Sequence, residues 1–149
     1  LIFFALLLIL GCETLREKSN VTSTIICPKV FFSLENGVYS NGELDSLNLE
    51  KVNYKATLNN YKFLDECFSD NIYNNYNLDI LILVEPINPR NKEIEMPIFV
   101  ITYDSQDNII DKHYFKVKDN LSYDGGSSNY LLTDVITKLN ILSKNSNVF

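Results

Sequence analysis

The sequence predicts an all-β domain, an antiparallel β-sandwich of about six or seven strands, preceded by a short apolar helix at the N-terminus. Three observations support this prediction. Short stretches rich in β-branched and aromatic residues recur along the chain, with turn residues between them. One stretch alternates strictly between apolar and polar residues, which is the period of a half-buried strand. Gly and Pro are scarce and 46% of the residues are hydrophobic, as expected for a domain with a packed core.

The N-terminal stretch from Leu1 to Leu10 carries no charged or strongly polar residue. Its length suits the apolar core of a signal peptide and falls short of the roughly 20 residues that span a bilayer. The run closes on Ile9-Leu10-Gly11-Cys12, which resembles the lipobox of bacterial lipoproteins. The resemblance implies peptidase cleavage between Gly11 and Cys12 and lipid attachment, as with palmitate, to the Cys12 thiol. A truncated transmembrane helix and a secretory peptide cut elsewhere are the alternatives.

This interpretation divides the chain into four segments. We expect a signal peptide over 1–11, a tether over 12–23, a β-sandwich domain over 24–142 and a disordered tail over 143–149. The tether is polar and lacks apolar periodicity, so we expect it to act as a spacer.

The first half of the domain contains three expected strands. Thr24 to Phe32 predicts an edge or bulged strand, because Pro28 cannot donate to a neighbouring strand. Lys51 to Leu58 shows the strict alternation and predicts a half-buried antiparallel strand. Asn59-Asn60 then predicts a turn, and Tyr61 to Phe68 predicts the return strand.

The second half contains longer apolar runs. Leu78 to Val84 predicts a central strand, because it is apolar on both faces apart from Asp79. Its expected core-facing residues are Leu78, Ile80, Ile82 and Val84. Ile94 to Tyr103 and Ile109 to Lys118 predict a hairpin. Tyr130 to Leu142 fits both a helical stripe and a strand, and the surrounding β-structure favours the strand.

The chain has three cysteines. If Cys12 carries lipid, Cys27 and Cys67 remain as a pair in an oxidising compartment, where a disulfide is expected. Two free buried thiols are the alternative.

Several short motifs together resemble a group of small, uncharacterised alphaproteobacterial envelope lipoproteins. The motifs are Cys27-Pro28-x-Val30, Tyr54-x-Ala56, Pro97-x-Phe99-Val100, Asp104, Ile109-Ile110-x-Lys112 and Phe115-x-Val117. The resemblance implies an immunoglobulin-like sandwich and offers no catalytic residue to carry over. The chain departs from those proteins at Asp107-Asn108, where they have Gly in the turn.

Composition and motifs argue against several functions. The net charge of −6 makes a nucleic-acid partner unexpected, because phosphate binding needs clustered Lys and Arg. The single histidine, His113, has no evident partner for catalysis. Asp104, Asp107 and Asn108 are typical of a hairpin turn and lack the spacing of a calcium loop. The stretch 125–128 predicts a flexible loop. We therefore expect no catalytic residue, metal or cofactor.

The expected function follows from the anchor and the aromatic content. Five tyrosines are too many for the core of so small a domain, and grouped on one face they would suit protein or glycan contact: Tyr61, Tyr73, Tyr76, Tyr114 and Tyr123. We expect a non-enzymatic interaction or assembly module of the cell envelope, held to the membrane by lipid on Cys12, with an envelope protein as partner. Glu13 after the cysteine favours the outer membrane, facing the periplasm. The alternative is a periplasmic lipoprotein that binds a small ligand or a glycan.

Overall fold

The computed structural model describes residues 22–42, 52–70, 72–125 and 129–144, so the predicted N-terminal helix lies outside the described residues. Within these ranges the chain forms ten β-strands and no helix, which confirms the all-β prediction. The expected number of six or seven strands is too low, because four of the ten are only two or three residues long. The strands are β1 (Ser23–Ile25), β2 (Val38–Gly42), β3 (Val52–Phe63), β4 (Cys67–Ser69), β5 (Tyr73–Pro86), β6 (Glu93–Tyr103), β7 (Ile109–Asn120), β8 (Tyr123–Asp124), β9 (Asn129–Tyr130) and β10 (Thr133–Lys144).

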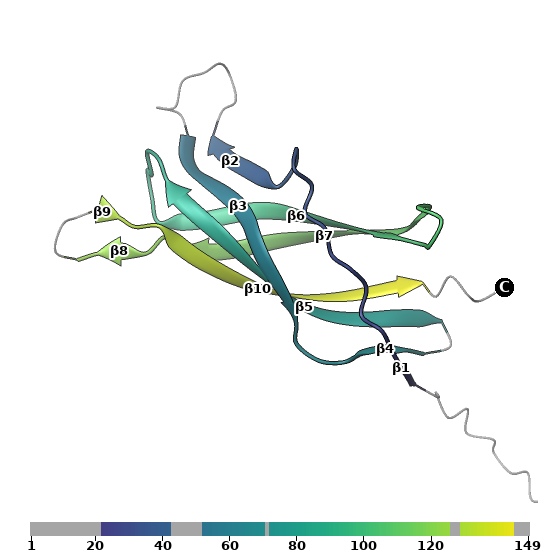
Figure 1. The fold of residues 1–149 in the computed structure, drawn as a ribbon. Coiled ribbons are helices and arrows are strands. Elements are labelled where there is room, and N and C mark those ends of the chain that lie inside the picture. Colours follow the sequence, from purple (N-terminus) through teal and green to yellow (C-terminus); the bar gives the residue numbers. More distant parts are fainter. Residues whose placement is uncertain (1–21, 43–51, 71, 126–128, 145–149) are drawn as a thin grey trace, which may run out of the picture.

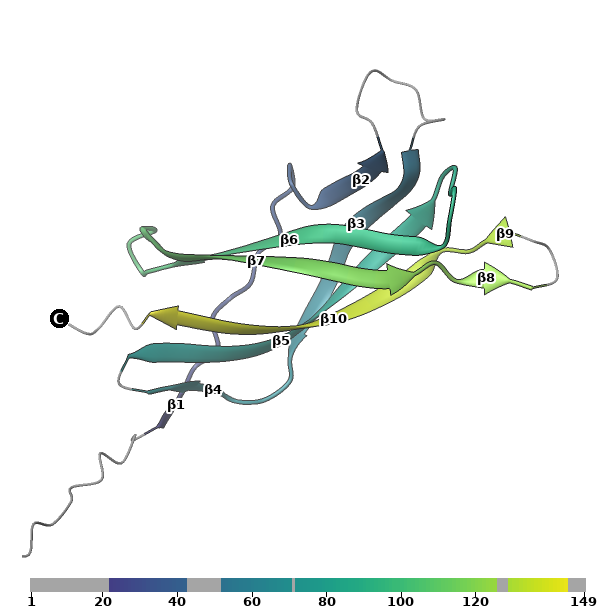
Figure 2. The same ribbon diagram turned by 180° about the vertical axis from the view of Figure 1, so that it is seen from behind.

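The strands form two layers that resemble a sandwich (Figure 1). The larger sheet is antiparallel with the order β1-β4-β5-β3-β2, and β10 pairs with the opposite edge of β5. Strands β6 and β7 form a separate antiparallel hairpin, which lies over one face of the larger sheet in both views (Figures 1 and 2). Strands β8 and β9 form a short third pair. The hydrophobic core therefore lies between the larger sheet and the β6–β7 hairpin.

Strand β5 is the centre of the larger sheet. It pairs with β3 and β4 along one edge and with β10 along the other. Its alternate side chains Leu78, Ile80, Ile82 and Val84 are all buried, which confirms their predicted orientation. Because alternate side chains of a strand point to the same face, all four lie on the face that the β6–β7 hairpin covers.

Strand β3 is longer than the sequence pattern predicted. The turn expected at Asn59-Asn60 is wrong, because β3 continues to Phe63. Its pairing with β5 shifts between Leu58 and Asn60, which is the signature of a β-bulge. The extra residue reverses the alternation, so that Tyr61 and Phe63 return to the core side and pack against it. The return strand is correspondingly short, since β4 covers only Cys67–Ser69.

The first strand is shorter than predicted. Only Ser23–Ile25 pairs, with β4, and the strand expected over 24–32 is wrong beyond Ile25. Pro28 lacks a backbone donor, and the segment leaves the sheet to cross the side of the molecule toward β2 (Figure 1). Val30 and Phe32 pack against the core, whereas Phe31 is 84% exposed.

The β6–β7 hairpin confirms the prediction for the two apolar runs. Eleven residues of β6 pair with β7, with a register shift between Thr102 and Tyr103. The connecting turn is held by the carboxylate of Asp104, which accepts hydrogen bonds from the amides of Gln106 and Asn108. Asp107 has a positive φ of 63°, a conformation that Asp adopts more readily than most residues.

The stretch from Tyr130 to Leu142, which fitted both a helix and a strand, forms strand β10 over most of its length. It pairs with β5 over twelve residues and buries Val135, Leu139 and Ile141 against the core. It extends to Lys144, so the sheet continues two residues past the boundary expected at 142. The buried set follows the strand period, which shows that pairing with β5 selected this conformation over the helical one.

Candidate functional site

The residues predicted for the anchor and the disulfide have different outcomes. Gly11 and Cys12 lie outside the described residues. Cys27 and Cys67 form a disulfide with a Cα–Cα distance of 5.2 Å, which confirms the predicted pairing. Cys67 is buried on β4, so the bond ties the irregular segment after β1 to the larger sheet. The disulfide thus fixes one end of the segment that borders the site described next.

A groove of about 640 Å³ opens between the two layers. Its floor is the inner face of the larger sheet, and its sides are β6 and the segment 28–32. The floor residues are apolar or aromatic and come from β3, β5 and β10: Phe63, Tyr76, Leu78, Ile80 and Ile141. Phe63 and Tyr76 are only half-buried, so this end of the core is less completely covered than the end near Val84.

Strand β6 borders the groove with its backbone edge. Every residue from Ile98 to Asp104 lines the groove, although alternate side chains of a strand point to opposite faces. Both sets reach the same space only where the groove runs along the edge of the strand. Among the described strands, β6 pairs with β7 alone, on its other edge. The groove is therefore a slot beside an edge strand.

The polar groups inside the groove are satisfied and uncharged. The hydroxyl oxygens of Thr102 and Ser143 are hydrogen-bonded at 2.9 Å, which links β6 to β10. The amide of Asp111 also donates to the Thr102 oxygen at 3.1 Å. Burial raises the pKa of the Tyr76 phenol above its ordinary value of 10.0, so Tyr76 is neutral at physiological pH. The interior therefore suits apolar groups.

Charged residues occur at the rim of the groove. Lys29 lies on one side, and Asp104 and Asp107 lie at the hairpin turn. Hydrogen bonds from the Asn108 side chain and backbone, followed by that from Gln106, lower the pKa of the Asp104 carboxyl. Asp104 is therefore ionised at neutral pH, and the turn end of the groove is acidic.

The outer face of the β6–β7 hairpin is apolar near the groove. Phe99 is 70% exposed, and its ring centroid lies 5.2 Å from that of Tyr114, which is 60% exposed. Ile101, Tyr103 and Ile109 extend this exposed set toward the turn. We call these five residues the hairpin face. Because Phe99, Ile101 and Tyr103 also line the groove, the hairpin face and the groove form one continuous surface.

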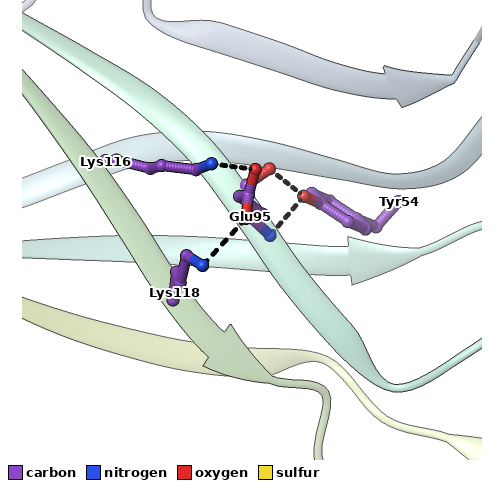
Figure 3. A network of polar contacts seen from close by, with 4 residues as sticks. All are labelled: Tyr54, Glu95, Lys116 and Lys118. Atoms are coloured by element: carbon purple, nitrogen blue, oxygen red, sulfur yellow. Dashed lines mark hydrogen bonds and ion pairs between the residues drawn. The ribbon is translucent and has the colours of Figure 1, made fainter.

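A buried phenol joins the two layers at the other end of the hairpin (Figure 3). The hydroxyl of Tyr54 donates to the backbone oxygen of Glu95 at 2.6 Å and accepts from its backbone nitrogen at 2.9 Å. The Glu95 side chain points away and pairs with Lys116 at 2.6 Å and Lys118 at 3.3 Å. Burial raises the pKa of Tyr54, so its hydroxyl stays protonated. These contacts fix β6 on β3 and leave the opposite half of β6 as the side of the groove.

The Tyr54→Phe substitution tests this link. It leaves the amide and carbonyl of Glu95 without their partner, and we expect a loss of about 1–3 kcal/mol in the free energy of unfolding. Urea denaturation measures the change. The control Tyr114→Phe removes a hydroxyl from an exposed ring and should shift stability by less than about 0.5 kcal/mol. Equal changes in the two variants would show that Tyr54 does not hold the layers together.

The other candidates from the sequence do not form a site. His113 is half-buried, and its ring stacks on Phe115 with centroids 6.4 Å apart. Its Nε2 is buried without a hydrogen-bond partner in the described structure. Asp104 and Asn108 are occupied in the turn, where the Asn108 side chain donates to Asp104 at 3.0 Å. In the described ranges, no group of three His, Cys, Asp or Glu side chains could hold a metal ion.

The predicted tyrosine face is replaced by a different aromatic surface. Tyr61 and Tyr76 pack against the core, and Tyr73, Tyr114 and Tyr123 are exposed on three different strands. The prediction of a hairpin from Ile94 to Tyr103 and Ile109 to Lys118 did not include an exposed apolar face. The sequence does indicate this face, because the outward-facing residues Phe99, Ile101 and Tyr103 in the second half of this strand are apolar or aromatic.

Comparison of the chain with protein-family models, with curated proteins and with solved structures finds no match. Over the residues that the structure describes, no helix is long and apolar enough to cross a membrane.

Proposed function

We propose that this chain is a non-enzymatic, lipid-anchored module of the bacterial cell envelope, with an immunoglobulin-like β-sandwich body that binds another envelope protein. Lipid on Cys12 holds the protein at the outer membrane on its periplasmic side, and 12–23 is the tether. Tethering raises the effective concentration of the domain for partners at the same surface. Binding at the membrane surface is thus the whole of the proposed activity.

The observation that carries the interaction role is the hairpin face together with the adjoining groove. Surface aromatic and aliphatic residues that stand singly need no explanation, but a continuous apolar set beside a groove is typical of a protein interaction site. Phe99 and Tyr114 supply large apolar rings to this surface, and such residues dominate the energy of many interfaces.

A small apolar ligand is the second candidate. The groove volume of about 640 Å³ falls in the range of small-molecule sites, and its floor is apolar. A glycan fits less well, because the hydroxyls of Thr102 and Ser143 are already paired with one another.

Radiolabelled palmitate tests the anchor. We expect wild-type protein in native cells to incorporate the label and to sediment with membranes, and we expect Cys12→Ala to lose the label. The matched control is Cys27→Ala, which removes a different cysteine and should keep the label. Undiminished label in Cys12→Ala would overturn the proposed anchor.

A further inference from the structure

We propose that the groove accepts an extended segment of a partner protein, which adds as a new antiparallel or parallel strand to the edge of β6 that pairs with no described strand. The proposal rests on the interaction role proposed above and names the chemistry of its partner. The incoming segment pairs its backbone with β6 and places every second side chain, an apolar one, over the groove floor.

The edge of β6 that borders the groove lacks the usual protection of an edge strand. Natural proteins protect edge strands with charged residues, Pro or bulges, because unpaired backbone groups recruit other chains. The first half of β6 has such protection in Glu93, Glu95 and Pro97. The stretch from Ile98 to Thr102 has no charged residue and no Pro, and the register shift comes only at its end, between Thr102 and Tyr103. The unprotected half of β6 is the half that lines the groove.

The slot has the dimensions of a short strand. The lining stretch of β6 from Ile98 to Tyr103 has six residues, which span about 20 Å in a strand. The opposite side is the irregular segment 28–32, which makes no described backbone pairing with β6. Inward side chains of an added strand would meet Leu78 and Ile80 on the floor. A segment of about six residues with alternating apolar side chains therefore matches the groove.

One end of the slot is acidic. Asp104 and Asp107 lie where the slot meets the hairpin turn, and the chain as a whole carries −6. A segment with Lys or Arg at that end complements these carboxylates. An acyl chain would fill the apolar floor but could not pair with the backbone of β6 or with the two acids. The partner is thus an extended, apolar-alternating segment with a basic end.

The test uses a defined peptide and the full chain in detergent-free lipid nanodiscs. The probe is a fluorescent eight-residue peptide in which Val and Thr alternate between terminal lysines. Two further peptides carry N-methyl groups on alternate amides, so that one or the other backbone edge is blocked. Strand addition predicts that one methylation pattern weakens binding by about tenfold or more, because several backbone hydrogen bonds are lost, while the other pattern binds like the parent peptide. Equal binding of both methylated peptides would overturn strand addition.

A matched pair of protein variants locates the site. Ile101→Lys places a charge on the groove edge, whereas Ile136→Lys places the same charge on the exposed outer face of the larger sheet. We expect Ile101→Lys to weaken peptide binding by about tenfold or more and Ile136→Lys to leave it unchanged. Hydrogen exchange on the wild-type protein should show new protection of alternate amides between Ile98 and Thr102 when the peptide binds. This measurement and the methylated peptides remain decisive if Ile101→Lys does not fold.

Three other outcomes would contradict the proposal. Binding of palmitate in the groove without binding of the peptide would assign the groove to a lipid chain. A dimer that Ile101→Lys abolishes would assign the β6 edge to a second copy. Peptide binding unaffected by Ile101→Lys would place the site elsewhere. None of these outcomes alters palmitate labelling at Cys12, so a failure here is distinct from a failure of the envelope anchor.

Discussion

Removal of the Cys27–Cys67 disulfide is expected to lower the free energy of unfolding by about 4 kcal/mol. The two cysteines are 40 residues apart, and a bridge of that separation restricts the unfolded chain strongly. The bond also holds the irregular segment after β1 against β4. The backbone pairing between β1 and β4 covers only three residues, so it holds this segment weakly without the disulfide.

Urea denaturation of the Cys27→Ala/Cys67→Ala double variant measures this effect. The control is Cys12→Ala, which leaves the disulfide in place and should have the same unfolding midpoint as the wild type. A loss smaller than about 1 kcal/mol would mean that the unfolded chain is already compact in this region.

Truncation of Ile82 to Ala is expected to cost about 2–5 kcal/mol in the free energy of unfolding. Ile82 is 1% exposed, and it lies between Leu58 on β3 and Val135 on β10. Strands on both sides and the hairpin above prevent the surrounding structure from closing the cavity. The milder Ile82→Val should cost about 0.5–1.5 kcal/mol.

The matched control for this experiment is Ile136→Ala. Ile136 belongs to β10 and is 65% exposed on the outer face, so its truncation should change stability by less than about 0.5 kcal/mol. Equal losses at Ile82 and Ile136, measured by urea denaturation, would contradict the placement of the core between the two layers.

Much of the fold could be predicted from the sequence where apolar residues follow a clear period. Leu78 to Val84 is apolar throughout, and β5 is indeed paired on both edges. The β6–β7 hairpin followed from two apolar runs around the turn at Asp104. The disulfide followed from counting, once Cys12 was assigned to lipid. Local pattern was sufficient in these cases because tertiary packing agrees with it.

Other features depend on tertiary contacts that local pattern does not encode. Asn59-Asn60 has the composition of a turn, but β3 stays paired with β5 on both sides of it, and the irregularity becomes a β-bulge. The segment after Ile25 has strand-forming residues, but the disulfide and Pro28 lead it across the side of the molecule. Strand β10 fits two periods, and only its partner decides between them.

The groove was beyond prediction for the same reason. Its residues come from β3, β5, β6, β10 and the segment 28–32, and no single stretch of sequence marks them. The edge position of β6 follows from the sheet order and not from its composition. An apolar run in a strand indicates burial. Only the assembled layers show that half of β6 has an exposed face and an edge that no described strand covers.

We propose that this disulfide-linked β-sandwich is exported and works outside the cytoplasm. The most direct test is to trap the thiols of intact cells with an alkylating reagent and to map the modified cysteines of this protein by mass spectrometry. The claim predicts that Cys27 and Cys67 react only after reduction, as the disulfide requires. Alkylation of both residues without prior reduction would contradict it.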